Sequence, residues 1–164
     1  MICDNLQECC AEERYICENK KDCLVFRDSR PQAVCEEKGK RYNLLNDRHF
    51  EIALYHMDGG MIRSEKNELK CDFLYVIYDH DNPTAIFVEL KGKDIRQAVA
   101  QLKASIDRYG SALKRRVCAR IVCSSVPRLY NDPIVKRMKK DLANQYNGTL
   151  HIFEKNKEER YSDL

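Results

Sequence analysis

The pattern of apolar and polar positions predicts β-strands from residue 50 onward. Between Phe50 and His56, apolar and polar side chains alternate with the period of a pleated strand. The runs at 73–78 and 85–88 are wholly apolar or aromatic, which is typical of strands buried on both faces. Because turn-forming residues at 79–84 separate these two runs, we expect them to form an antiparallel hairpin.

Two helices are predicted from their capping residues. Asp94 is a good N-cap, and Gln97 three residues later completes a capping-box spacing, so a helix is expected to run to about Tyr109, with Gly110 as its terminator. The pair at 132–133, Asp followed by Pro, begins a second helix that ends near Gly148. The apolar positions expected to face the core are Ile95, Val99, Leu102, Ile106, Ile134, Met138 and Leu142.

The order of these elements predicts the fold class. Further strand-like runs lie at 117–123 and 149–153, and Met61 and Ile62 are expected to begin a return strand after the turn at 58–60. Strands that follow a helix need crossover connections to rejoin their sheet. We therefore expect an α/β domain with a mixed central sheet flanked by helices.

The chain divides into three predicted segments. Residues 1–40 are interpreted as a cysteine-rich N-terminal extension, in which 31–40 could form a short helix that starts at a proline. Residues 41–155 are expected to form the folded domain, and 156–164 a charged, frayed tail. The first segment has a net charge of −2 and the remainder a net charge of +5, so a polyanionic partner is allowed but not required.

Composition excludes several classes of protein. The chain has 164 residues, of which 43% are hydrophobic, which suits one domain with a sizeable core. Its apolar runs are strand-sized and far shorter than the roughly 20 residues of a membrane-spanning helix. The first ten residues have neither a basic start nor an apolar stretch of signal-peptide length, so we expect a cytoplasmic protein.

Nine cysteines raise the question of disulfides or metal binding. An odd number of cysteines and the expected reducing compartment favour free thiols over disulfides. The cysteines of the first segment show no Cys-x-x-Cys pair, the spacing that makes a zinc site convincing, so zinc there is a secondary alternative. They are Cys3, Cys9, Cys10, Cys17, Cys23 and Cys35.

Three charged residues interrupt the strands that should be buried. Asp72 lies near the start of one hairpin strand, and Glu89 and Lys91 lie near the end of the other. Residues two apart in a strand share a face, and counting outward from the turn places Asp72 beside Glu89. Two adjacent carboxylates form an oxygen-rich site that suits Mg²⁺ or Mn²⁺. With a lysine beside it, such a site can support metal-assisted hydrolysis of a phosphodiester.

This constellation resembles the PD-(D/E)xK nuclease superfamily, with its restriction-endonuclease-like fold, over about residues 50–153. The surrounding motifs are similar to those of short, largely uncharacterised bacterial members. The resemblance implies that Asp72 and Glu89 are metal ligands, that the carbonyl of Leu90 is a further ligand, and that Lys91 acts on the attacking water. Gln101 matches a glutamine position of some members. Cys71 replaces the motif's proline.

An additional acidic ligand is not settled by the resemblance. The early acidic residue of the superfamily has only weak counterparts here, which are Glu36, Glu37 and Glu51. Asp58, polar and at a strand end, is the preferred additional ligand.

The sequence therefore favours a metal-dependent nuclease that acts on DNA more readily than on RNA, in defence or repair. Two alternatives stay open: a catalytically silent nucleic-acid-binding or regulatory module of the same fold, and a zinc-dependent interaction protein. Cutting both strands of a duplex would favour a homodimer. The basic side chains proposed to contact phosphates are Lys136, Arg137, Lys139 and Lys140.

Overall fold

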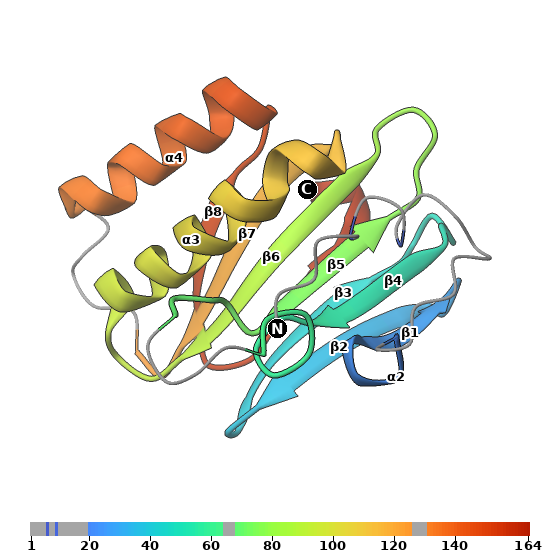
Figure 1. Ribbon diagram of the computed structural model, residues 1–164, viewed down its shortest axis with the longest axis horizontal. Helices are drawn as coiled ribbons and strands as arrows, with labels where there is room; N and C mark the ends of the chain where they lie inside the picture. Colours follow the sequence, from blue (N-terminus) through green and yellow to red (C-terminus); the bar gives the residue numbers. More distant parts are fainter. Residues whose placement is uncertain (1–5, 7–8, 10–19, 64–67, 126–130) are drawn as a thin grey trace.

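The computed structural model describes residues 6, 9, 20–63, 68–125 and 131–164. Within these residues the protein is a mixed α/β structure with three layers (Figure 1). A six-stranded mixed sheet lies in the middle, two long helices cover one of its faces, and a three-stranded sheet packs on the other face. The predicted α/β class with a mixed central sheet is confirmed.

The central sheet has the strand order β1-β4-β5-β6-β7-β8. The neighbouring strands from β1 to β4, β5 and β6 in this order pair antiparallel, whereas β7 pairs parallel with β6 and β8 pairs parallel with β7. The predicted hairpin is confirmed as the antiparallel pair β5 and β6. The strands are β1 (Leu24–Asp28), β4 (Ile52–His56), β5 (Phe73–Ile77), β6 (Thr84–Lys91), β7 (Arg116–Cys123) and β8 (Leu150–Glu154).

The smaller sheet corrects two predictions. It consists of β2 (Gln32–Glu37), β3 (Lys40–Leu45) and β9 (Lys157–Arg160), with β9 parallel to β3. The helix expected at 31–40 is wrong, because this segment alternates buried and accessible residues as a strand does. The frayed tail is also wrong, because β9 is paired and a 3₁₀ turn (Tyr161–Asp163) follows it.

The boundary at residue 40 does not separate an extension from the domain in the part of 1–40 that the structure describes. β1 is an edge strand of the central sheet, and β2 belongs to the smaller sheet. A short helix α2 (Lys20–Cys23) precedes β1. Apart from residues 6 and 9, the segment before Lys20 lies outside the described residues. The expected return strand at 61–62 is reduced to an isolated bridge between Asp58 and Ile62.

The two long helices are α3 (Ile95–Leu113) and α4 (Pro133–Tyr146). Asp94 caps α3 as predicted, since its side chain accepts a hydrogen bond from the backbone N–H of Gln97. The expected end at Gly110 is wrong, and α3 continues to Leu113. A side chain at Gly110 would come within 3.0 Å of the Tyr146 hydroxyl, so this glycine permits close packing of α3 against α4.

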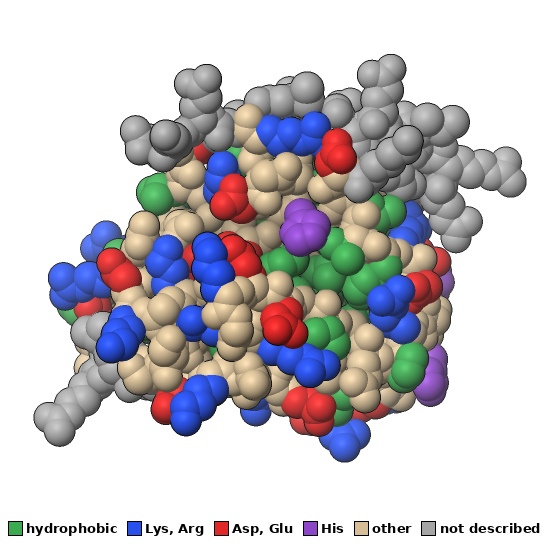
Figure 2. All heavy atoms as spheres, turned by 90° about the horizontal axis from the view of Figure 1, so that it is seen from below, with side chains coloured by type: hydrophobic (Ala, Val, Ile, Leu, Met, Phe, Trp, Pro, Cys, Tyr) green, Lys and Arg blue, Asp and Glu red, His purple; other side chains and the backbone are tan. Residues whose placement is uncertain are grey.

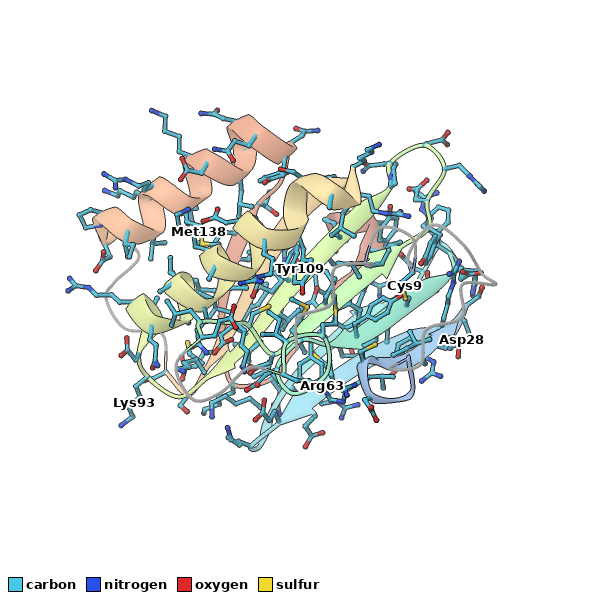
Figure 3. The ribbon with its side chains drawn as sticks, viewed as in Figure 1. Cys9, Asp28, Arg63, Lys93, Tyr109 and Met138 are labelled. Atoms are coloured by element: carbon cyan, nitrogen blue, oxygen red, sulfur yellow. The ribbon has the colours of Figure 1, made fainter. Side chains whose placement is uncertain are left out.

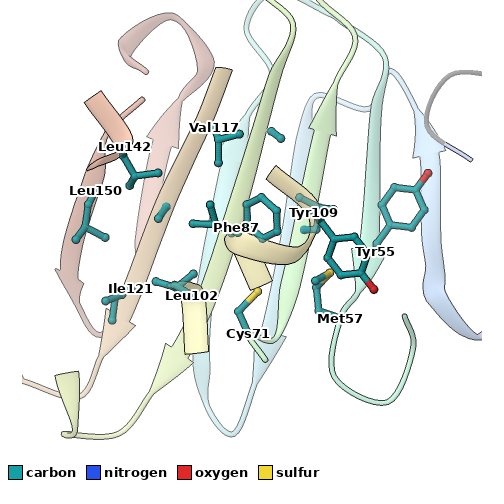
Figure 4. Close-up of a cluster of buried hydrophobic side chains, with 14 of the residues drawn as sticks. Tyr55, Met57, Cys71, Phe87, Leu102, Tyr109, Val117, Ile121, Leu142 and Leu150 are labelled. Atoms are coloured by element: carbon teal, nitrogen blue, oxygen red, sulfur yellow. The ribbon is translucent and has the colours of Figure 1, made fainter. Parts of the chain in front are cut away.

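The core beneath the helices is formed by alternate residues of the strands and by one face of each helix (Figure 4). In α3 all four predicted core positions are buried. In α4 one prediction is wrong: Ile134 is 38% exposed, and the next residue, Val135, is buried in its place. None of the helices in the described ranges is long and apolar enough to cross a membrane.

A second core lies between the two sheets. Cys35 and Tyr42 of the hairpin β2–β3 are buried in the same cluster as Val88 and Leu90 of β6. The Tyr75 hydroxyl donates a hydrogen bond to the carbonyl of Ala33, 3.1 Å away, which ties β5 to β2. The smaller sheet is therefore anchored across the strands that carry the charged residues of interest.

Candidate active site

The sheet topology brings several strand ends to one edge. β5 is antiparallel to both β4 and β6, so these two strands end where β5 begins. The last registered pair of the hairpin is Phe73 with Val88, and the N–H of Asp72 donates to the carbonyl of Val88 at 3.2 Å. Asp72 and Glu89 are consequently adjacent across the hairpin, as the residue count predicted. We name this edge the carboxylate edge, defined by Asp72, Glu89 and Lys91.

Asp72 is held in place by the neighbouring strand. Its Oδ2 accepts a 2.6 Å hydrogen bond from the backbone N–H of Leu90. Burial raises the pKa of Asp72 to about 7, the hydrogen bond from Leu90 opposes this rise, and the nearby Glu37 carboxyl adds to it. Because N–H and C=O of one strand residue point to the same side, the carbonyl of Leu90 faces the side of β6 on which Asp72 lies.

Glu89 is a buried carboxyl whose second oxygen lacks a partner. Its side chain is 2% exposed, and Oε2 has no hydrogen-bond partner among the described residues. Lys91 Nζ lies 3.7 Å from the other oxygen. Burial, followed by the charge of Asp72, raises the pKa of Glu89 to about 9. A buried carboxylate oxygen without a hydrogen-bond partner destabilises the folded protein unless a nearby cation compensates its charge.

Lys91 is positioned by α3. Its Nζ donates to Oε1 of Gln101 at 2.8 Å, and Nε2 of Gln101 donates to the carbonyl of Lys70 at 3.0 Å. The amide of Gln101 therefore links the segment before β5 to the lysine at the end of β6. Gln101 is half-buried, and its side chain contacts Lys91.

For the nuclease expected from the sequence, replacing Gln101 with alanine should lower the cleavage rate about 10-fold, because Lys91 then loses the acceptor that orients its ammonium group. The rate should be measured by nuclease assay at saturating metal. Gln97→Ala, on the exposed first turn of the same helix, is the matched control and should retain the wild-type rate. Equal rates for the Gln101 and Gln97 variants would contradict a positioning role for Gln101.

Glu37 is an acidic neighbour that the sequence did not single out. It ends β2, and its contact with Asp72 is among the causes that raise the pKa of Asp72. Its charge also raises the pKa of Glu89. In the sequence, Glu37 is one of three weak counterparts of an early acidic residue, in a segment that is expected to be helical. The alternation of buried Ala33 and Cys35 could have revealed the strand.

Asp58, the preferred additional ligand, lies at the border of the carboxylate edge. Its side chain is 58% exposed and forms an ion pair with Lys70 Nζ at 3.1 Å. Its charge raises the pKa of Glu89 less than the charges of Asp72 and Glu37 do. The structure therefore places Asp58 near the pair, paired with a lysine, whereas Glu37 contacts Asp72.

The basic residues proposed from sequence to contact phosphates lie elsewhere. They occupy α4, which packs on β7 and β8 and not on the strands of the carboxylate edge. Three of them, Lys136, Arg137 and Lys140, are exposed. The structure does not bring this group together with Asp72 and Glu89.

The N-terminal cysteines give no metal centre in the part of the chain that is described. Cys9, Cys23 and Cys35 are buried. Cys3, Cys10 and Cys17 lie outside the described residues. The three cysteines of the strands, Cys71, Cys118 and Cys123, are also buried and free, as expected for small apolar side chains.

A divalent cation is compatible with Asp72 and Glu89. Across residues 6, 9, 20–63, 68–125 and 131–164, no three His, Cys, Asp or Glu side chains lie in an arrangement that could hold a metal. Mg²⁺ commonly takes only one or two protein carboxylates and fills its shell with water and substrate oxygens. The unpartnered Oε2 of Glu89 and the mutual repulsion of the two carboxyls are what a cation between them would relieve.

Comparison with known proteins finds no match: no family model, no curated protein and no solved structure is similar to this chain. The chemistry of the carboxylate edge is therefore the basis for a proposed function.

Proposed function

We propose that this protein is a Mg²⁺- or Mn²⁺-dependent nuclease that hydrolyses DNA phosphodiester bonds at the carboxylate edge. The observation that carries the proposal is the buried carboxyl of Glu89 beside Asp72, whose Oε2 has no hydrogen-bond partner among the described residues. A lysine held by Gln101 completes the group. Structural ion pairs at a sheet edge would satisfy both carboxyls, whereas this arrangement leaves one oxygen available.

The side chains have distinct roles in this proposal. Asp72, fixed by the N–H of Leu90, and Glu89 present oxygens to the cation, with the carbonyl of Leu90 on the same side of the strand. When bound, the cation neutralises phosphate charge and lowers the pKa of coordinated water. Lys91 holds or orients the attacking water beside the scissile phosphate, and Gln101 keeps the ammonium group in position.

The same residues support membership of the PD-(D/E)xK superfamily as part of the proposal. Asp72 and the sequence Glu89-Leu90-Lys91 lie at adjoining ends of β5 and β6, and α3 follows directly. The parallel strand β7 then extends the sheet on the other side of β6. The hairpin β2–β3 packs on the face of the central sheet that the helices do not cover, and the order of elements expected from the sequence did not include it.

The proposal is tested by incubating the purified protein with circular duplex DNA, linear duplex DNA, single-stranded DNA and RNA. Each substrate is combined with Mg²⁺, Mn²⁺ or EDTA. Cleavage of DNA with either cation, and none in EDTA, is the expected result. Cleavage confined to RNA would replace DNA as the substrate. Binding of nucleic acid without cleavage in any metal would contradict a nuclease and favour a silent binding module.

A further inference from the structure

The turn between β2 and β3 is a tight two-residue turn. Glu37 pairs with Lys40 in the ladder, so only Lys38 and Gly39 form the loop. Both loop residues have positive φ angles, 48° and 73°, as a type I′ hairpin turn requires. Cys35 and Tyr42, which are also paired with each other in the ladder, are buried against the central sheet. These two buried residues anchor the hairpin to the central sheet, and the turn lies beyond them.

This tip carries cations to the border of the acidic group. The ammonium of Lys38 is 2.9 Å from Glu37 Oε1, and its side chain is 83% exposed. The charges of Asp72 and Asp58 contribute to the raised pKa of Lys38, after its contacts with Glu37. Burial raises the pKa of the Cys123 thiol at the end of β7, whereas the charge of Lys40 lowers this pKa. In Figure 1 the β2–β3 turn lies on the lower side of the molecule, where β6 also ends, and β3 packs against β6 and β7.

A polyanion cannot approach carboxylates without compensating cations. Figure 2 shows the lower face of the view in Figure 1, where Lys and Arg side chains surround acidic ones instead of forming a separate patch. Lys93, after the end of β6 and before α3, projects from the same lower border in Figure 3. Lys38 and Lys40 thus belong to the hairpin of the smaller sheet, and Lys93 lies between the end of β6 and the start of α3.

We propose that the β2–β3 hairpin tip is the substrate-holding element of this protein, and that Lys38 and Lys40 bind the phosphates that flank the scissile bond of a nucleic acid. The inference rests on the proposed nuclease function. Lys38 exchanges its exposed ion pair with Glu37 for a phosphate contact, which costs little because exposed ion pairs are weak. The basic face of α4 then has no part in substrate binding.

The test compares nucleic-acid binding and cleavage in charge variants that keep the aliphatic stem. Lys38→Gln, alone and combined with Lys40→Gln, is compared with Lys103→Gln/Lys114→Gln. The control pair matches because Lys103 forms an exposed ion pair with Asp107 and Lys114 has a positive φ. A third variant is Lys136→Gln/Lys140→Gln on α4. Binding of a fluorescent DNA duplex is measured by anisotropy in EDTA over a range of salt concentrations, after each variant is shown to be folded.

The double hairpin variant is expected to bind DNA about 10-fold more weakly, with a salt dependence shallower by roughly 2 in log–log slope. The control and α4 variants should bind as wild type does. Loss of binding in the α4 variant with none in the hairpin variants would overturn the inference, as would unchanged binding in all variants of a protein that cleaves DNA. A wild type that neither binds nor cleaves any nucleic acid would overturn the proposed function as well.

Discussion

Glu89→Gln is expected to lower metal-dependent cleavage at least about 1000-fold, because the neutral amide removes the charge that holds the cation and aligns it with the phosphate. Gln preserves the size of the side chain, so the loss reports on charge and not on packing. The rate is measured by single-turnover cleavage in Mg²⁺ and in Mn²⁺. Glu36→Gln, at an exposed position of β2, is the matched control and should be fully active. A Glu89→Gln variant with more than a tenth of the wild-type rate would contradict the assignment.

The same substitution is expected to stabilise the metal-free protein. The pKa of Glu89 is raised from 4.5 to about 9 by burial and by Asp72, so proton uptake favours the folded state and stability falls as pH rises between these values. Gln does not titrate. In EDTA at pH 8.5 the variant should therefore melt roughly 3–8 °C above wild type, and at pH 5 the difference should nearly vanish. A variant that melts lower than wild type at both pH values would show that the buried carboxyl is structurally satisfied.

Glu159→Ala is expected to destabilise the protein by about 3–5 kcal/mol, because it leaves a fully buried guanidinium without its counter-ion. Arg120 is 0% exposed between the two sheets, and its Nε donates to Glu159 at 2.8 Å. The Tyr42 hydroxyl donates to the same carboxylate at 2.7 Å. The free energy of unfolding is measured by urea denaturation, with Glu158→Ala on the same strand as the exposed control. A loss below about 1 kcal/mol in Glu159→Ala would contradict a locking role for this ion pair.

The pH dependence of stability is a second test of the ion pair between Glu159 and Arg120. Burial opposes ionisation of Glu159, but hydrogen bonds from His151 and Arg120 outweigh it and lower its pKa to about 2. The resulting stabilisation is present above the ordinary pKa of 4.5 and is lost as pH falls toward 2. In Glu159→Gln the stability should be flatter across this range than in wild type.

The central sheet and the carboxylate edge could be predicted because their signals are local in sequence. The strands of the hairpin are dense in β-branched and aromatic residues, and a short turn separates them. Counting from that turn was enough to place Asp72 beside Glu89, and the N-cap at Asp94 located α3. The charged residues of the candidate site could be predicted for the same reason, because they stand out within apolar strands.

The smaller sheet could not be predicted because its pairings are non-local or ambiguous. β9 and β3 are more than a hundred residues apart in the sequence, and the residues near Lys157 do not indicate which strand β9 pairs with. β2 is short and begins after a proline, which equally suits the first turn of a helix. The position of Glu37 beside Asp72 depends on how this hairpin crosses the central sheet. That packing follows from the burial of Cys35 and Tyr42, which only the folded structure reveals.

We propose that Asp72 and Glu89 hold a divalent cation, and a calorimetric titration with Mn²⁺ in the absence of nucleic acid tests this proposal. Wild-type protein is compared with Glu89→Gln, Asp72→Asn and the Glu36→Gln control, each shown to be folded. We predict saturable binding at pH 8 in wild type and control, and at least a 10-fold loss of affinity in the two site variants. No Mn²⁺ binding in wild type, or equal binding in all four proteins, would contradict the proposal.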